Sequence, residues 1–543
     1  MMIDFKNYIA EIVSNALAEL DIESNVIVEK SSNPDFGDFS TNIALSLAKQ
    51  LKSNPLEIAK NIGNLLQYDN KIISEYSVTK PGFLNFHISD NYYQKTLNNI
   101  ISESESFGAS NIGKNKTANV EFVSANPTGP LTVGHGRQAV LGDTIANILE
   151  WHNYKVTREY YYNDAGRQMR ILGESVAARY FNLIGKNFTF PEDGYKGEYI
   201  ISIAKEIKNI HGEGLDTNSP VFRKEAEKAI FNDIKKTLNS IGINHDVFSN
   251  EQTYYDNGSI DTLVEKLTNK NLIYKSDGAV WFKATDLGLE KDRVYYKSSG
   301  EATYRLPDTA YHQHKLDRSF DLVVDIFGAD HADAYPDVLA ALNALGLNTD
   351  PIKVLIHQFV TLLKSGEKVK MSTRKANFVT LDQLINEVGV DVVRYFFIMR
   401  SMNSHLNFDL DLAADQSEKN PVYYIQYAHA RISNIINNGK VNNLSINGKF
   451  DTSLLINKSE ISLIKSLNDF PEVMVKVLDN LDPQIIATYL HNIASEFHKF
   501  YAKCRVMTDD IELTKSRLHL VKSVKVVLGN GLKILGIQAP ERM

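Results

Sequence analysis

The sequence predicts an α/β protein in three parts: an α+β part, a part built on a parallel sheet, and an all-helical part. Three observations support this prediction. Short strand-like runs alternate with helical periodicity between residues 111 and 410, the pattern of a parallel sheet with crossover helices. After residue 411 the apolar spacing is almost wholly helical. At 543 residues the chain is also too long for a single core.

Residues 1–110 form the predicted α+β domain. Periodicity predicts a helix over Ile3–Leu20 and strands over Ile73–Val78 and Phe83–Ile88, and an Ala/Leu-rich helix is expected after residue 42. A turn over Pro34–Asn42 carries two aromatic residues, Phe36 and Phe39, and both a core position and an exposed, ligand-contacting position are open for them. The polar, Gly/Ser/Asn-rich stretch Ser102–Asn115 is the expected linker to the next domain.

Residues 111–410 contain the predicted parallel sheet. Its expected strands include Ala118–Val123, Val156–Tyr162, Leu322–Phe327 and Ile352–Leu363. Helical stretches between Glu174 and Leu238 are expected to be inserted between the two halves of this sheet. The first strand leads into a Pro/Gly-rich turn, Asn126–Arg137, and then into a helical run, Gln138–Leu149. This order of strand, turn and helix is typical of the place where open α/β sheets bind nucleotides.

The turn after the first strand has the features of a phosphate site. It places a helix N-terminus, with its free amides and the positive end of its dipole, beside a bound anion. Gly134 and Gly136 are expected to let the ligand approach the backbone closely. His135, between them, can donate a hydrogen bond to a phosphate oxygen. For this stretch alone, a tight turn with an incidental histidine is the competing interpretation.

The composition excludes several classes of protein. The formal net charge is −7, so a nucleic-acid partner would need local basic patches. Cys504 is the single cysteine, which excludes an intrachain disulfide and a cysteine-cluster zinc site, and no structural metal is expected. No apolar run approaches ~18 residues, and no secretory leader is evident. The expectation is a cytoplasmic protein that makes no membrane contact.

A second motif lies in a basic loop far downstream. Together with the first, it resembles the two signatures of class I aminoacyl-tRNA synthetases, known as HIGH and KMSKS. They read here Thr132-Val133-Gly134-His135 and Lys370-Met371-Ser372-Thr373-Arg374, so Thr132 replaces the first His and Thr373 replaces the second Lys. Tyr162–Gln168 and the final helical region are similar to the arginyl-tRNA synthetase family in particular. The resemblance covers essentially the whole chain.

The resemblance implies a Rossmann-type catalytic domain at 111–410, between an N-terminal tRNA-contacting domain at 1–110 and an α-helical anticodon-binding domain at 411–543. It implies that ATP, as its Mg²⁺ complex, activates L-arginine, and that the arginyl group then passes to the 3′-terminal adenosine of tRNA(Arg). The implied catalytic residues are His135 and Lys370. The implied ATP-binding residues are Thr132, Gly134, His135, His357, Lys370, Met371, Ser372 and Arg374. Whether Arg374 or Lys375 supplies the charge lost at Thr373 stays open.

An arginine substrate needs acidic side chains, because a guanidinium is planar, always charged and matched by a carboxylate. The family's arginine-binding positions fall here on Glu121, Asn126, Glu251, Tyr304 and Asp308. Glu251, Tyr304 and Asp308 are implied to hold the guanidinium, whereas Glu121 and Asn126 are implied to lie near the α-amino group. Tyr304 and Asp308 are one helical turn apart and can face one pocket. For any one of these acids alone, a solvated surface charge is the competing interpretation.

Residues 411–543 form the predicted all-α domain. Its expected helices are Pro421–Ile436, Leu463–Leu481, Gln484–Val506 and Leu513–Leu535. By the resemblance, Tyr423, Tyr427 and Arg431 in this domain contact tRNA, as does Phe36 in the N-terminal domain. Further basic residues are expected to contribute: Lys503, Arg505, Lys515, Arg517, Lys522 and Lys525. The alternative is that the tyrosines fill a helical core and the charges are solvated. A monomer is expected.

Two other functions stay open at this stage. A degenerate relative that binds tRNA without catalysis is supported by Thr132 and Thr373 and opposed by the intact His135 and Lys370. A small-molecule adenylate-forming ligase on the same fold is opposed by the helical C-terminal domain. ATP–pyrophosphate exchange across amino acids, with and without tRNA, separates the three functions.

Overall fold

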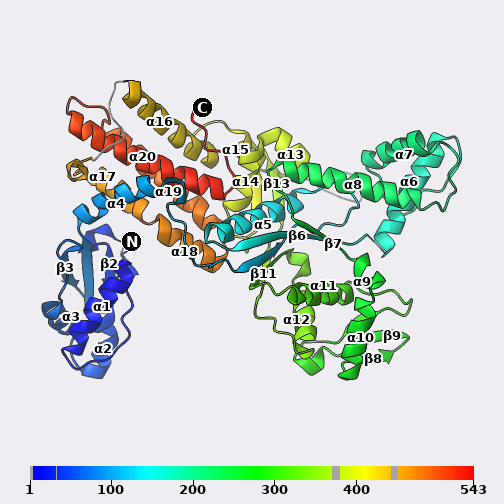
Figure 1. Ribbon diagram of the computed structural model, residues 1–543, viewed down its shortest axis with the longest axis horizontal. Coiled ribbons are helices and arrows are strands. Elements are labelled where there is room, and N and C mark those ends of the chain that lie inside the picture. Colours follow the sequence, from blue (N-terminus) through cyan, green and yellow to red (C-terminus); the bar gives the residue numbers. More distant parts are fainter. Residues whose placement is uncertain (1–3, 32, 165, 370–378, 442–449) are drawn as a thin grey trace.

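The structure is a computed structural model that describes residues 4–31, 33–164, 166–369, 379–441 and 450–543 (Figure 1). The molecule is elongated. The N-terminal domain and most of the C-terminal helices lie at one end, the helices of residues 166–240 project at the other, and the parallel sheet lies between them. Among the described helices, none has the length and apolar character that a membrane crossing requires.

The N-terminal domain combines three helices with an antiparallel sheet of order β1-β2-β4-β3. Its elements are α1 (Phe5–Ala18), β1 (Glu29–Lys30), η1 (Pro34–Phe36), β2 (Phe39–Thr41), α2 (Ile43–Leu51), α3 (Pro55–Leu65), β3 (Ile73–Thr79) and β4 (Phe83–Ile88). Both predicted helices, α1 and α2, and both predicted strands are confirmed. Asp4 caps α1, and Asn54 followed by Pro55 begins α3. Phe39 is buried in the core, whereas Phe36 is 48% exposed.

The central sheet has five parallel strands in the order β12-β11-β5-β6-β7. They are β5 (Thr117–Glu121), β6 (Lys155–Tyr162), β7 (Val247–Asn250), β11 (Leu322–Gly328) and β12 (Ile352–His357). The predicted parallel sheet is therefore confirmed. Helix α5 (Val133–Trp151) follows the central strand β5 and is buried along most of its length, because the sheet packs on one part of it and C-terminal helices on another. The loops that follow the strands meet at one edge of the sheet.

Two insertions interrupt the sheet. The first, α6 (Gly166–Leu183), α7 (Glu198–His211) and α8 (Val221–Ser240), joins β6 to β7. The prediction that these helices separate the two halves of the sheet is wrong, since β6 and β7 are neighbours. The separating insertion is α9 (Gln252–Asp256), α10 (Ser259–Asn269), β8 (Ile273–Ser276), β9 (Ala279–Phe282), η3 (Thr285–Leu287), β10 (Arg293–Tyr296) and α11 (Arg305–Asp317), with β8–β10 forming a small antiparallel sheet. Periodicity identifies a helix but not the strands that it connects.

The predicted strand Ile352–Leu363 is two strands. β12 ends at His357, and β13 (Val360–Lys364) belongs to a small sheet with β14 (Glu367–Lys368) and β15 (Leu406–Asp409). The strand is interrupted at Gln358. The amide of Gln358 donates to the Met402 carbonyl, and its carbonyl accepts a 2.7 Å bond from the buried Arg137. The other helices of this domain are α12 (Tyr335–Ala344), α13 (Leu381–Val388), α14 (Val390–Ile398) and α15 (Leu410–Ala414), with the turn η4 (Ala329–His331) after β11.

The C-terminal domain is helical, as predicted. Its elements are α16 (Pro421–Val441), η6 (Thr452–Leu454), α17 (Lys458–Asn468), α18 (Phe470–Asn480), α19 (Gln484–Lys503) and α20 (Ile511–Ile534). The single helix predicted over Leu463–Leu481 is two helices, α17 and α18. Pro471 explains the break, because proline is favoured in the first turn of a helix and disfavoured in its interior.

The C-terminal domain is docked on α5 by specific polar contacts. Arg394 is buried and donates to the Leu535 carbonyl at 2.8 Å, to the Ile241 carbonyl at 2.9 Å and to Asp143 on α5 at 2.6 Å. Asn147 on α5 donates to the Ile534 carbonyl at 3.0 Å. The expected linker begins as structured chain, because α4 (Asp90–Glu103) and η2 (Ser104–Ser106) pack against α20. The division at residues 110 and 410 stays a prediction.

Candidate active site

The N-terminus of α5 is a capped helix start. Thr132 is the N-cap residue: its side chain accepts a bond from the His135 amide, and its own amide donates to His135 Nδ1 at 3.2 Å. Because Nδ1 accepts a hydrogen bond, the proton of a neutral His135 sits on Nε2, which is left as a donor. Burial lowers the pKa of His135 to about 4, although Asp330 acts in the opposite sense. At neutral pH the histidine is therefore an uncharged donor.

The two glycines of this turn differ in their surroundings. At Gly134 an added Cβ would meet only the Thr132 hydroxyl, 3.7 Å away, so the space above this backbone is open. At Gly136 an added Cβ would lie 2.6 Å from Leu381 and 3.1 Å from Phe397. The expectation that Gly136 admits a ligand is therefore wrong: the residue is small because α13 and α14 pack against α5 there. Gly134 keeps its predicted role.

His357 lies at the end of β12, on the same side of the site. It is buried, and its Nδ1–H donates to the Gln358 carbonyl at 3.3 Å. Burial lowers its pKa to about 4, while the bond to Gln358 raises it and the charge of Arg137 lowers it further. Asp330, on the turn after β11, raises the pKa of both His135 and His357. The start of α5 and the ends of β11 and β12 therefore lie close to one another.

Several predicted ATP-binding residues lie outside the described residues: Lys370, Met371, Ser372 and Arg374, together with Thr373 and Lys375. The structure does describe the chain that leads to them. β13 and β14 form a hairpin, and Gly366 in its turn has a φ of 76°, which favours glycine. The Ser365 amide donates to Asp411 at 2.5 Å. Gly366 therefore forms the turn of the hairpin that precedes residue 370.

Glu251 lies at the end of β7 and is only 7% exposed. Its carboxylate accepts a 3.0 Å bond from the Tyr161 hydroxyl and a 2.6 Å bond from the Asn163 side chain. Burial raises its pKa to about 7, the bond from Tyr161 lowers it, and the charges of Asp308 and Asp164 raise it. A cation between Glu251 and Asp308 would reverse this effect and ionise Glu251.

Asn126 is held beside this acid through one shared partner. Its side-chain oxygen accepts a 3.0 Å bond from the Asn163 amide, and its nitrogen donates to Gln168 at 3.0 Å. Asn163 also donates to Glu251. The structure therefore brings together Asn126 and Glu251, which are far apart in the sequence.

Tyr304 and Asp308 both lie at the start of α11. Tyr304 precedes the helix, is 55% exposed, and has the Arg305 guanidinium 4.9 Å from its ring centroid. Asp308 is partly exposed, and its carboxylate lies 3.2 Å from Nδ1 of the buried His312. The predicted spacing places both residues at the same end of the helix, open to solvent.

Glu121, the last residue of β5, is buried and already paired. One of its oxygens accepts a 2.8 Å bond from Ser124, and the other forms an ion pair with Lys315, which is fully buried on α11. Lys315 also pairs with Asp325 on β11. A carboxylate oxygen of Glu121, a carboxylate oxygen of Asp325 and a ring nitrogen of His312 lie within 4.8 Å of one another. The Lys315 ammonium supplies a positive charge to this group from within the chain.

Comparison with known proteins identifies the family. The model of the arginyl tRNA synthetase N terminal domain matches residues 6–88, that of the tRNA synthetases class I (R), catalytic domain, matches residues 96–436, and that of the DALR anticodon binding domain matches residues 425–543. The arginine–tRNA ligase of Desulfotalea psychrophila is 49% identical over 521 residues, with 95% of this chain and 94% of the relative covered. This chain belongs to the arginyl-tRNA synthetase family.

Other relatives agree with this assignment. The arginine–tRNA ligase of Salinibacter ruber is 47% identical, with 98% of both chains covered. The structure of the Thermus thermophilus arginyl-tRNA synthetase superposes with a TM-score of 0.77, covering 99% of this chain and all of the other. At 21% identity this last likeness shows the fold alone.

In the part matched by the anticodon-binding model, aromatic and basic side chains gather between α16 and α19. The Arg431 guanidinium lies 4.9 Å from the Tyr427 ring centroid and 5.0 Å from that of Tyr501, and the Tyr427 ring lies 6.2 Å from His498. Tyr423, Tyr424 and Tyr427 are half-buried. Three of the expected basic contacts are already ion-paired within the chain: Arg517 with Glu460, Lys515 with Glu512 and Lys525 with Glu541.

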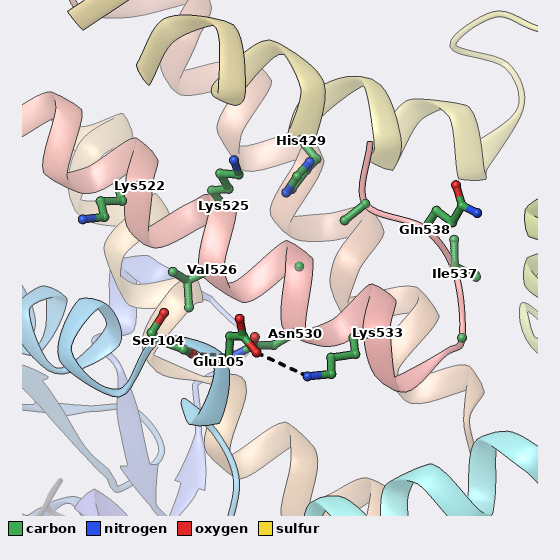
Figure 2. Close-up of a pocket in the computed structure, with 13 residues that line it drawn as sticks. Ser104, Glu105, His429, Lys522, Lys525, Val526, Asn530, Lys533, Ile537 and Gln538 are labelled. Atoms are coloured by element: carbon green, nitrogen blue, oxygen red, sulfur yellow. Dashed lines mark hydrogen bonds and ion pairs between the residues drawn. The ribbon is translucent and has the colours of Figure 1, made fainter. Parts of the chain in front are cut away.

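A hollow of about 670 Å³ lies elsewhere in this domain, between α20, η2 and the last residues of the chain (Figure 2). Lysines line it, but Lys533 pairs with Glu105 across it at 3.4 Å and Lys525 pairs with Glu541 at 2.7 Å. None of the described site residues lines it. The hollow is therefore separate from the strand-end site, the group of residues at the ends of β5, β6, β7, β11 and β12, at the start of α5 and on α11.

Sequence reasoning missed several polar residues of the strand-end site. They are Tyr161, Asn163, His312, Lys315 and Asp325. His312 and Lys315 lie one and two helical turns after Asp308, so the helical spacing that paired Tyr304 with Asp308 extends to them. Tyr161 directly precedes the Tyr162–Gln168 stretch quoted for the family, and Asn163 lies within it. No sequence signal marks Asp325, whose neighbours on β11 are apolar.

Proposed function

We propose that two groups of side chains divide the work of this arginine–tRNA ligase. The reaction uses ATP to convert L-arginine to arginyl-adenylate and transfers the arginyl group to the 3′-terminal adenosine of tRNA(Arg). The acid pair Glu251 and Asp308 is the observation on which the substrate assignment rests. Glu251 follows a strand of the sheet, the charge of Asp308 on α11 raises the pKa of Glu251, and a guanidinium between the two carboxylates would pair with both.

Arginine is proposed to lie beside these two acids. Its guanidinium would contact Glu251 and Asp308, with Tyr304 at its side. Asn126 would lie near the α-amino group. Glu121 was expected there as well, but both of its oxygens accept bonds within the chain. We therefore assign Glu121 to the support of the site, through Lys315.

ATP is proposed to lie at the N-terminus of α5. The open backbone at Gly134 and the donor Nε2–H of His135 would serve the phosphates, and His357 would face the adenine. Thr132 would act as the helix cap that presents His135. Lys370, Met371, Ser372 and Arg374 would reach the phosphates from the opposite side, and Mg²⁺ would accompany the nucleotide as part of the substrate.

tRNA is proposed to contact both terminal domains, through Phe36 in the first and Tyr423, Tyr427 and Arg431 in the last. Phe36 suits this role because its ring is exposed, and Arg431 because it stacks on two tyrosines. We further propose that the protein acts as a monomer in the cytoplasm.

ATP–pyrophosphate exchange tests the proposal directly. The protein should exchange label with L-arginine and not with lysine or citrulline, in the presence of tRNA. Asp308→Asn should raise the arginine KM by at least tenfold. The bound guanidinium would lose one of its charged partners, and removing one partner of a desolvated charge pair costs roughly 2–5 kcal/mol. Exchange with every amino acid alike, or an unchanged KM in Asp308→Asn, would overturn the pocket assignment.

A further inference from the structure

Helix α11 carries a polar stripe that runs from the open edge of the site into the core. Asp308, His312 and Lys315 are spaced at i, i+4 and i+7, so they lie on one face of the helix. The strands opposite carry Asp325 on β11 and Glu121 on β5, and these two residues are direct neighbours in the parallel pairing. Three acids and two bases from three elements thus meet at one place.

His312 bridges the open and the buried end of this stripe. Its Nδ1–H is shared between the Asp308 carbonyl at 2.8 Å and the Asp308 carboxylate at 3.2 Å, and its Nε2–H donates to Asp325 at 3.1 Å. Burial alone would lower the pKa of His312, but the charge of Asp308 and the bonds to Asp308 and Asp325 outweigh burial and raise it to about 10. Both ring nitrogens therefore donate, and the ring cannot rotate without losing a charged partner.

Lys315 fixes the buried end. Its ammonium lies between Asp325 and Glu121 and 4.4 Å from the centroid of the Tyr311 ring, with no exposed surface. Asp325 therefore accepts from His312 with one oxygen and from Lys315 with the other. Burial raises the pKa of Glu121, whereas Lys315 and His312 hold the pKa of Asp325 well below its ordinary value. Asp308 is the exposed member of the stripe, with a side chain 24% exposed.

We propose that His312 is a positioning residue for arginine, which fixes the Asp308 carboxylate towards the guanidinium, and that Asp325 and Lys315 hold His312 in place. The proposal rests on the proposed role of Asp308. Without the imidazolium, the Asp308 carboxylate is free to change rotamer, and the buried Asp325 loses one of its two donors. Binding of the arginine guanidinium must then also order the Asp308 side chain. This cost weakens arginine binding more than it changes kcat.

The test is a double-mutant cycle on the full-length protein, with the arginine and ATP KM values and kcat measured by tRNA aminoacylation. His312→Gln should raise the arginine KM by about tenfold, the usual effect of losing a hydrogen bond to a charged group, and change kcat and the ATP KM by less than about threefold. In the Asp308→Asn background, His312→Gln should add less than about twofold, because its effect passes through Asp308. His314→Gln, on the same helix, is the matched control and should leave all three constants unchanged.

The possible results separate the inference from the assignment beneath it. If the effects of His312→Gln and Asp308→Asn on KM multiply in the double variant, His312 does not act through Asp308 and the inference is wrong. If Asp308→Asn alone leaves the arginine KM unchanged, the proposed role of Asp308 fails first. Should His312→Gln not fold, Asp325→Asn replaces it in the cycle, since it removes the far partner of the imidazolium; an arginine KM equal to that of the unmodified protein would then overturn the inference.

Discussion

Arginine affinity should depend on pH through Glu251. In the protein without substrate, burial raises the pKa of this carboxyl to about 7 from its ordinary value of 4.5. A guanidinium prefers the ionised carboxylate, so binding must first remove the proton wherever one is present. About a tenth of Glu251 is ionised at pH 6 and about nine-tenths at pH 8, so the arginine dissociation constant should fall about tenfold between these values.

The same shift predicts the opposite trend for stability. A carboxyl whose folded pKa is raised favours the folded state only while it is protonated. The free energy of unfolding of the substrate-free protein should therefore fall as the pH rises from 4.5 to 7, by about 3 kcal/mol from this group. Glu251→Gln keeps a hydrogen-bonding side chain of the same size at the position and removes the ionisation. The variant should bind arginine weakly at every pH and be more stable than the unmodified protein at pH 8.

Isothermal titration calorimetry of arginine at pH 6, 7 and 8 measures the first effect. Repeating the titration in buffers of different ionisation enthalpy counts the protons released, which should be close to one at pH 6 and near zero at pH 8. Denaturant unfolding of the two proteins between pH 4.5 and 8 measures the second. Proton release that is absent at pH 6, or that persists unchanged in Glu251→Gln, would refute the reasoning.

Three further predictions follow from other parts of the molecule. Lys370→Ala should slow adenylate formation in pre-steady-state measurements with little loss of ATP affinity, since the loop charge matters most as the phosphates separate; an unchanged rate would assign that role to Arg374 or Lys375. Arg394→Met should lower the free energy of unfolding by about 3–5 kcal/mol, because it leaves Asp143 without one buried partner, and a denaturant titration showing less than 1 kcal/mol would contradict this. Tyr427→Ala and Arg431→Ala should each weaken tRNA binding in a filter assay without altering the arginine dissociation constant; tRNA affinity equal to that of the unmodified protein would exclude this face of α16.

Much of the architecture could be predicted from the sequence, because short apolar runs between turns identify strands, and a 3.6-residue period identifies helices. The strand–turn–helix unit around His135 is a local feature, and it is present. The predictions that proved wrong depend on contacts between residues that are far apart in the sequence. Gly136 was assigned to a ligand although Leu381, more than 200 residues away, is what excludes a side chain there. The break at Gln358 depends on Arg137, which is equally remote in the sequence.

The same distinction holds for the site. Tyr304 and Asp308 share a helix, so their proximity followed from spacing alone. The partners of Glu121 could not be predicted, because Lys315 lies on α11 and Asp325 lies on a strand about 200 residues later. The register of β5 against β11 places both acids side by side, where the buried Lys315 pairs with each of them. The contact between Glu121 and the substrate stays a prediction.

Helix α5 runs from the proposed ATP site to the C-terminal helices. Its 19 residues span about 28 Å as a single rod. His135 lies near one end, and Arg137 donates to the Gln358 carbonyl between β12 and β13, while Asp143 and Asn147 further along are bonded to Arg394 and to the Ile534 carbonyl at the end of α20. A displacement of the anticodon-binding helices must therefore either break these bonds or tilt the rod and carry His135 with it. A change in the position of the C-terminal helices on tRNA binding could therefore be transmitted through α5 to His135.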